Sequence, residues 1–144
     1  MANGYYNDPA SSQSAFVHGW FRTNDIGYMP EAGRLVVLGR ADDMLNIGGL
    51  KISPGPMEEA IRRIPTIIDA VVVRADGTAD VGDLLVAIEC EGGHAAPGTD
   101  QAVRAIVSAY VRTFHLMPLP SFPRTETGKV RRAEIEAAFR RRLG

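Results

Sequence analysis

Residues 44–57 read MLNIGGLKISPGPM, and this stretch decides how the middle of the chain folds. Two short apolar runs flank a Gly–Gly pair, a pattern typical of a tight β-hairpin. Ser53 and Pro54 follow as a favoured N-cap and a favoured first helical residue. The stretch therefore predicts a short hairpin that leads directly into a helix.

Outward from this point, helices and strands alternate toward the C-terminus. The helix that begins at Ser53 carries apolar residues at helical spacing and ends before Pro65. Residues 67–74 and 84–91 are β-branched and aliphatic, as core strands are. Thr99 and Asp100 predict the cap of a longer amphipathic helix. Its expected apolar face consists of Val103, Ile106, Val107, Tyr110, Val111 and Phe114.

The remaining C-terminal segment contains an extended stretch, a loop and a last helix. Residues 117–123 hold three prolines, which exclude a helix. Residues 125–130 are polar and predict a loop, and residues 133–143 predict the final helix. Together with the central stretch, these elements predict an α+β fold with a small, mainly antiparallel sheet flanked by helices.

Residues 1–39 do not follow this pattern. The first 18 residues are polar and are expected to be irregular. Residues 20–29 and 34–39 predict two strands joined by a Pro-to-Gly turn. We therefore expect residues 1–39 to be the tail of a large N-terminal domain and to contain this β-hairpin. Residues 40–144 are expected to form a separate domain.

Composition excludes several classes of protein. The chain is 45% hydrophobic with a net charge of −1, which gives no reason to expect nucleic acid or a membrane as a partner. A single cysteine, Cys90, allows no internal disulfide, and its place at the end of a core strand predicts a small buried apolar side chain. The first ten residues lack an apolar signal core. These features predict a cytoplasmic location.

The histidines and the basic residues near the C-terminus are also informative. His18, His94 and His115 are too scattered for a metal site, and none is expected. From Arg124 onward there are seven basic residues against three acidic ones. This excess is compatible with an anion neighbour or with a solvated helix face, and more weakly with nucleic-acid binding.

Three segments carry recognisable motifs. They are residues 19–25 (GWFRTND), residues 39–54 (GRADDMLNIGGLKISP) and residues 123–129 (PRTETGK). In order and spacing they resemble three signatures of the adenylate-forming (AMP-binding) superfamily, in wording closest to acyl-CoA synthetases. The chain is identified as resembling the C-terminal domain of such an enzyme, which rotates between adenylation and thioester formation.

The resemblance implies roles for particular residues. Lys129 matches the lysine that reaches the active site during adenylation, where a cation separates two anions. Asp25 and Arg40 match residues that contact the ribose of the nucleotide. Asn24 departs from the family, where glycine is usual, and we expect a turn with positive φ there because Asn tolerates it.

Two further matches concern the movement of the domain and the thiol. Asp42 matches the hinge residue. Gly48 and Gly49 match the loop beside the pantetheine arm of CoA, where absent side chains let a thin substrate pass. Lys51 has two interpretations, a phosphate contact and a solvent-facing strand residue.

The resemblance also implies what the complete enzyme uses. ATP, CoA and Mg²⁺ are expected as its substrates and cofactors, with none bound tightly by this chain, because the family's phosphate-binding loop, acid pocket and magnesium-associated glutamate are absent. We expect the chain to be inactive alone and to work with an N-terminal adenylation domain, joined or separate, on a carboxylic acid. The alternative is a companion module that docks on another protein without catalysis, or self-associates through residues 20–39.

Overall fold

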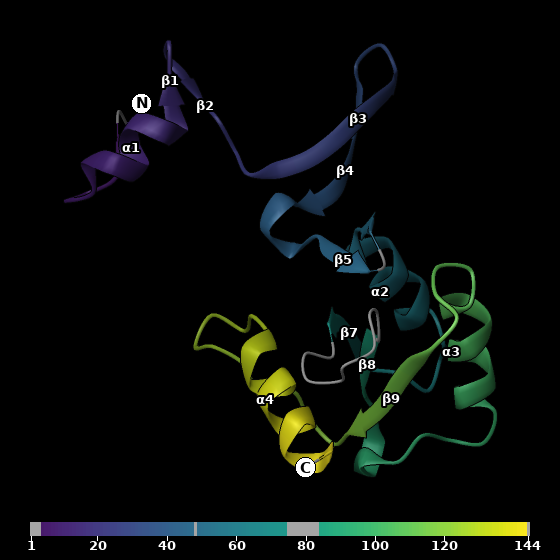
Figure 1. Ribbon diagram of the computed structural model, residues 1–144. Coiled ribbons are helices and arrows are strands. Elements are labelled where there is room, and N and C mark those ends of the chain that lie inside the picture. Colours follow the sequence, from purple (N-terminus) through teal and green to yellow (C-terminus); the bar gives the residue numbers. More distant parts are fainter. Residues whose placement is uncertain (1–3, 48, 75–83, 144) are drawn as a thin grey trace. The chain divides into compact units, whose positions relative to one another are not determined.

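The computed structural model describes residues 4–47, 49–74 and 84–143 (Figure 1). The chain divides into two compact units, Met1–Asp42 and Asp43–Gly144. The predicted division lay after residue 39, and the assignment of the first part to the tail of another domain stays a prediction.

The first unit contains one helix and two antiparallel strand pairs. Strands β1 and β2 pair with each other, and the longer β3 and β4 form the predicted hairpin. The elements in chain order are α1 (Pro9–Ala15), β1 (Phe16–Val17), β2 (Trp20–Phe21), β3 (Asp25–Glu31) and β4 (Arg34–Arg40). The 3₁₀ turn η1 (Ala41–Asp43) spans the division between the units.

Two local expectations for this unit were wrong. Residues 9–15 are helical, not irregular, because Asp8 caps the helix by accepting a hydrogen bond from the Ser11 N–H at 3.0 Å and Pro9 starts it. The single strand expected over 20–29 is divided into β2 and β3. The Arg22 N–H donates to the carbonyl of Ala15 at 2.6 Å, so the chain leaves β2 before β3 begins.

The second unit is the predicted α+β fold. Its sheet has the order β7-β8-β9, with β7 and β8 antiparallel and β9 parallel to β8. Strands β5 and β6 form the short hairpin predicted around the Gly–Gly pair. The elements are β5 (Leu45–Ile47), β6 (Leu50–Ile52), α2 (Pro54–Arg62), β7 (Asp69–Arg74), β8 (Leu84–Glu89), η2 (Glu91–Gly93), α3 (Thr99–Val107), β9 (Phe114–Leu119) and α4 (Arg132–Leu143).

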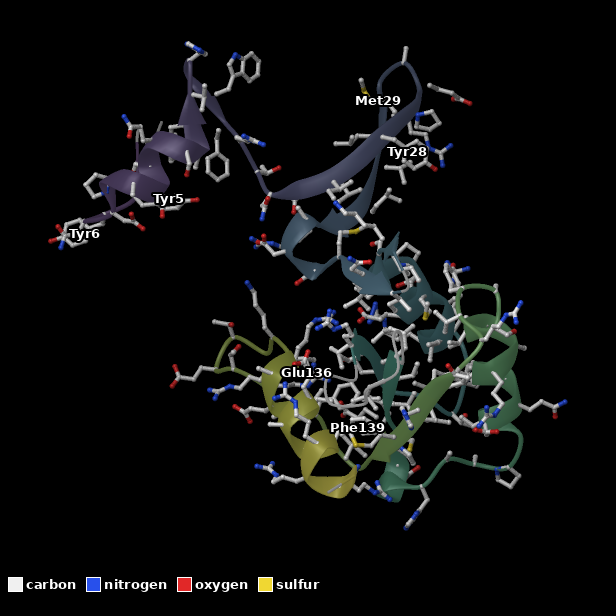
Figure 2. All side chains as sticks on the ribbon, viewed as in Figure 1. Tyr5, Tyr6, Tyr28, Met29, Glu136 and Phe139 are labelled. Atoms are coloured by element: carbon white, nitrogen blue, oxygen red, sulfur yellow. The ribbon has the colours of Figure 1, made fainter. Side chains whose placement is uncertain are left out.

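Both faces of this sheet are buried, so the unit has three layers. Val72 and Val86 pack with side chains of α2 and α3 in one cluster. Val71 and Leu85, which alternate with them along the strands, pack with α4 through Ile135 in the other. Figure 2 shows Phe139 of α4 within this second cluster. The central strand β8 is therefore enclosed, as its apolar sequence predicts.

The longer helix is shorter than expected. It ends at Val107, and Phe114 begins β9, where it is the parallel partner of Leu84. Tyr110, expected on the apolar face, is 42% exposed. The helix also begins differently, since Gly98 is the N-cap and Thr99 is buried against Thr66 with their hydroxyls 2.9 Å apart. Strand pairing thus overrides the helical spacing of the sequence.

One buried ion pair joins three elements of this unit. The carboxylate of Glu58 in α2, 3% exposed, accepts hydrogen bonds from the Arg132 guanidinium of α4 at 2.6 and 2.9 Å. It also accepts from the Val72 N–H of β7 at 2.8 Å. Although burial opposes the charge, the hydrogen bond and charge of Glu58 raise the pKa of Arg132. The start of α4 is therefore fixed to the sheet.

None of the helices in residues 4–47, 49–74 and 84–143 combines the length and the apolar composition that a membrane-spanning helix needs.

Replacing a core isoleucine should cost far more stability than replacing an exposed one. Ile61 is fully buried and Ile68 is 61% exposed. We expect Ile61→Ala to lower the free energy of unfolding by about 2–5 kcal/mol, and Ile68→Ala to change it by less than about 0.5 kcal/mol. Chemical denaturation of both variants measures this. Equal losses would contradict the assigned core.

Candidate functional site

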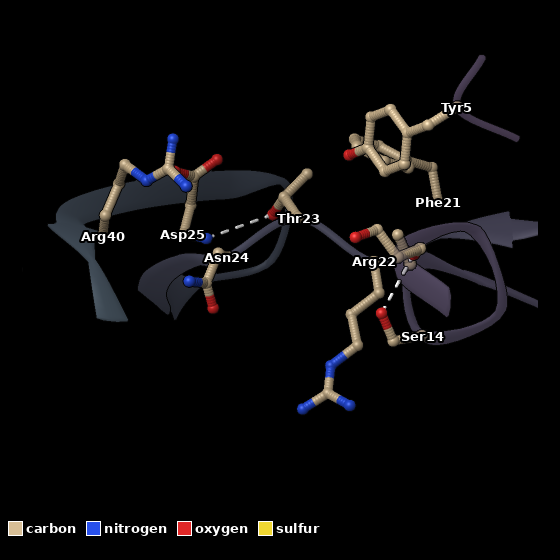
Figure 3. A pocket seen from close by; sticks show the side chains of 10 residues that line it. Tyr5, Ser14, Phe21, Arg22, Thr23, Asn24, Asp25 and Arg40 are labelled. Atoms are coloured by element: carbon tan, nitrogen blue, oxygen red, sulfur yellow. Dashed lines mark hydrogen bonds between the residues drawn. The ribbon is translucent and has the colours of Figure 1, made fainter. Parts of the chain in front are cut away.

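The first unit contains a cavity of about 480 Å³ that includes both predicted nucleotide-binding residues. Figure 3 shows Asp25 and Arg40 as neighbours, and they are register partners at the ends of β3 and β4. The hairpin therefore brings together two residues that are far apart in sequence. The residues that line the cavity are Tyr5, Ser11, Ser14, Ala15, Phe21, Arg22, Thr23, Asn24, Asp25 and Arg40.

The cavity combines several kinds of chemistry. Arg22 and Arg40 supply cations, Asp25 supplies a carboxylate, and Tyr5 and Phe21 supply aromatic rings with centroids 6.5 Å apart. Such a mixture can accept an anionic ligand that also carries hydroxyl groups and a flat ring. Helix α1 contributes Ser11, Ser14 and Ala15 to the cavity lining. The sequence analysis did not predict these lining residues because it did not predict α1, although Asp8–Pro9 is a recognisable helix start.

Asn24 does not adopt the expected positive φ. Among the described residues only Asn7 and His18 are non-glycine residues with positive φ, so the backbone of Asn24 lies in the ordinary region. Its carbonyl accepts a hydrogen bond from the Ala41 N–H at 2.8 Å. The backbone geometry at Asn24 therefore does not require glycine.

The predicted hinge residue lies at the end of the first unit. Asp42 belongs to the exposed turn η1, directly before the division between the units. Its carboxylate is 3.3 Å from the Arg40 guanidinium, with both side chains more than half exposed. An ion pair of this kind contributes little stability, so it does not oppose a change of backbone angles.

Of the predicted glycine pair, Gly49 lies in the turn between β5 and β6, and Gly48 lies outside the described residues. Gly49 has φ +85°, and a Cβ built there meets no atom within 4 Å. The turn therefore leaves open space beside its backbone. Lys51 follows on β6 and is exposed, which fits the solvent-facing interpretation.

Lys129 lies in a compact loop between β9 and α4. The Thr125 N–H donates to the Lys129 carbonyl at 2.8 Å, and the Gly128 N–H donates to the Thr125 carbonyl at 2.9 Å. Gly128 has φ +81°, which allows this tight turn. The Lys129 side chain is exposed, and it has no ion pair within 4 Å among the described residues. Its backbone is hydrogen-bonded within the loop, while its side chain is exposed.

The base of this loop contains an ion cluster that the sequence did not reveal. The Arg124 guanidinium lies 2.8 Å from the carboxylate of Asp69 and 2.8 Å from that of Glu89. Asp69 also pairs with Arg62 at 3.2 Å. These partners come from separate parts of the chain, so no local pattern indicates them.

The described residues contain neither a cluster of metal-ligating side chains nor an exposed thiol. Within the described ranges, no three His, Cys, Asp or Glu side chains gather as a metal site. Cys90 is 2% exposed, and burial raises the pKa of its thiol. The prediction of a small buried apolar residue at this position is confirmed.

Comparison with known proteins gives a consistent result. The chain matches no family model. It is 36% identical, over 96% of its length, to a probable 2-succinylbenzoate–CoA ligase of Mycobacterium tuberculosis. It is 39% identical, over 48% of its length, to a 4-chlorobenzoate–CoA ligase of an Arthrobacter species.

This chain belongs to the adenylate-forming superfamily.

The fold of this adenylate-forming domain agrees with that assignment. A solved anthranilate–CoA ligase, AuaEII in complex with anthranoyl-AMP, matches 94% of the chain with a TM-score of 0.76 at 20% identity. The chain spans 37% and 13% of the two curated relatives and 27% of the solved chain. The resemblance drawn from the three motifs is therefore confirmed, as is the α+β fold.

Two cations three residues apart should differ sharply in their effect on stability. We expect Lys129→Ala to change the free energy of unfolding by less than about 0.5 kcal/mol, because its side chain is exposed. Arg132→Ala should cost about 3–5 kcal/mol, because it leaves the buried carboxylate of Glu58 without its cation. Denaturant titrations of both variants measure this. A large loss for Lys129→Ala would show that the lysine is structural.

Proposed function

We propose that this adenylate-forming domain is the mobile C-terminal part of an ATP-dependent acyl-CoA synthetase, an acid–thiol ligase. The observation that carries the proposal is the environment of Lys129. An exposed amine on an ordered loop can enter the nucleotide cleft of an adenylation domain without disturbing the core of its own unit.

The chemistry of adenylation explains why such an amine is needed. A carboxylate that attacks the α-phosphate of ATP brings two anions together, and a cation placed between them lowers the repulsion in the transition state. Arg132 cannot serve, because its guanidinium is committed to Glu58. Lys129 is the residue that both the motif and the geometry favour.

The cavity of the first unit supports a role in holding the nucleotide. The Asp25 carboxylate can accept hydrogen bonds from both ribose hydroxyls, and Arg40 lies beside it as its register partner. We propose that these two residues contact the ribose. The position of Asp42 as the last residue of the first unit, in an exposed turn, supports its proposed role as the hinge.

We propose that the turn between β5 and β6 serves thioester formation. The open space beside Gly49 supports passage of the pantetheine arm of CoA, and Gly48 is proposed for the same loop. Both curated relatives are named as CoA ligases, which favours CoA as the thiol. ATP and Mg²⁺ belong to the complete enzyme, which we place in the cytoplasm, and this chain alone is expected to hold none of these ligands tightly.

A second candidate function rests on exposed apolar side chains of the β3–β4 hairpin. Tyr28 and Met29, labelled in Figure 2, are 52% and 69% exposed, and Leu35 and Val37 are 65% and 59% exposed. They fit docking on an adenylation domain, and equally a companion module or self-association. Size-exclusion chromatography of the chain at several concentrations separates self-association from a monomer that needs a partner.

Adenylation can be tested in a chimera. In the M. tuberculosis relative, the segment that aligns with this chain is replaced by the chain itself. We expect ATP–pyrophosphate exchange with 2-succinylbenzoate in the chimera, and a loss on the order of 10²–10³-fold in its Lys129→Ala variant. The negative control is the M. tuberculosis relative from which the aligned segment has been removed. A folded but inactive chimera, beside an active parent, would falsify the proposal.

The thioester step can be tested with a matched pair of glycine variants. Gly49 and Gly33 have nearly equal φ, +85° and +84°, and open space around both. Gly49→Leu and Gly33→Leu therefore introduce similar backbone strain. In the chimera, we expect Gly49→Leu to slow acyl transfer from the adenylate to CoA, on the order of 10²-fold, and Gly33→Leu to leave it unchanged. Equal rates in both variants would remove Gly49 from the CoA path.

A further inference from the structure

Two carboxylates face each other at one end of the sheet. Asp69 begins β7, Glu89 ends β8, and the two are direct register partners. Their side chains are 18% and 12% exposed, so water screens them poorly. Like charges directly opposite on antiparallel strands destabilise a sheet. This end of the sheet therefore requires a cation between the two carboxylates.

Arg124 supplies that cation. One nitrogen, Nη2, lies 2.8 Å from Oδ2 of Asp69 and 2.8 Å from Oε2 of Glu89. The hydrogen bonds that Arg124 donates to Asp69, and then those to Glu89, raise the pKa of Arg124 above its ordinary value, so it stays charged. Arg62 occupies the other oxygen of Asp69 at 3.2 Å. The planar guanidinium is thus held in one orientation.

The other nitrogen of the same guanidinium points to the Lys129 loop. Nη1 of Arg124 donates to the Gly128 carbonyl at 3.3 Å. That carbonyl precedes Lys129 directly in the chain. Arg124 therefore connects the end of the sheet to the peptide that carries the lysine, through three hydrogen bonds donated by one side chain.

The loop is closed on its other side by its own hydrogen bonds. Arg124 and Val130 form an isolated antiparallel bridge, and the Arg131 N–H donates to the Pro123 carbonyl at 2.8 Å. The Lys129 N–H donates to Oγ1 of Thr125 at 3.1 Å. These bonds give the loop its shape. The Arg124 side chain ties that shape to the carboxylates of β7 and β8, and the Phe122 N–H, just before the loop, also donates to Oε2 of Glu89 at 3.2 Å.

We propose that Arg124 is a positioning residue for adenylation, which holds the Lys129 loop in a fixed orientation on the sheet through Asp69, Glu89 and the Gly128 carbonyl. The inference rests on the proposed function, since it assumes that Lys129 acts in adenylation. Lysine at 124 would keep the charge. It could not reach two carboxylates and a carbonyl at once, because it lacks the planar fork.

The kinetic test uses the chimera described above. We expect Arg124→Met to lower ATP–pyrophosphate exchange about 10–100-fold, since a displacement of about 1 Å can cost about 10²-fold. Arg124→Lys should recover part of the rate. Transfer from a supplied acyl-adenylate to CoA should change less than twofold. The control is Arg131→Met, whose side chain pairs with Glu134 at 2.9 Å and leaves the loop untouched.

A second measurement uses this chain without a partner. Amide hydrogen exchange in Arg124→Met should be faster at Gly128 and Lys129, with β8 and α4 unchanged. Faster exchange throughout the unit would mean that Arg124 is only a general stabiliser, and would overturn the inference. Unchanged loop exchange with full adenylation activity would do the same.

The two proposals fail in different ways. If Lys129→Ala adenylates normally in an active chimera, the proposed function fails. If Lys129→Ala is inactive while Arg124→Met is fully active, the proposed function stands and the positioning role is refuted.

Discussion

The second unit depends on one constraint, which is that a sheet of three short strands must be covered on both faces. Strand β8 is buried along Leu84–Ile88, and its side chains alternate between two clusters. Helices α2 and α3 cover one face, and α4 covers the other. Helix α4 follows β9 through residues 120–131, and this connection passes the end of the sheet where Asp69 and Glu89 lie. The lysine loop therefore starts and ends at elements fixed by burial.

Three cations in or beside this connection, Arg124, Lys129 and Arg132, have different surroundings. Arg132 is joined to the buried Glu58 and serves the packing of α4. Arg124 lies between two partly buried carboxylates and a loop carbonyl. Lys129 is exposed, and the described residues offer it no carboxylate within 4 Å. Of these three cations, Arg124 and Arg132 are held by carboxylates, whereas Lys129 is left exposed.

Features that depend on neighbouring residues could be predicted from the sequence, whereas features that depend on contacts between distant segments could not. Local signals predicted the hairpin at 44–52, the helix from Ser53 and the two apolar strands, and motif resemblance predicted the family. Helix α3 was predicted too long because the pairing of Phe114 with Leu84 is a contact between distant segments. The Arg124 cluster was missed for the same reason, since its partners lie 55 and 35 residues away. The roles of Lys129, Asp25, Arg40, Asp42 and the glycine pair stay predictions.

The burial of Cys90 has a consequence for the chemistry of an enzyme of the proposed kind. An acyl-adenylate is a reactive mixed anhydride, and any accessible thiolate nearby would compete with the intended acceptor. The only sulfhydryl in this sequence is 2% exposed and held in its neutral form at the end of β8. A domain of the proposed kind can thus approach an activated acyl group without presenting a thiol that would compete with the intended acceptor.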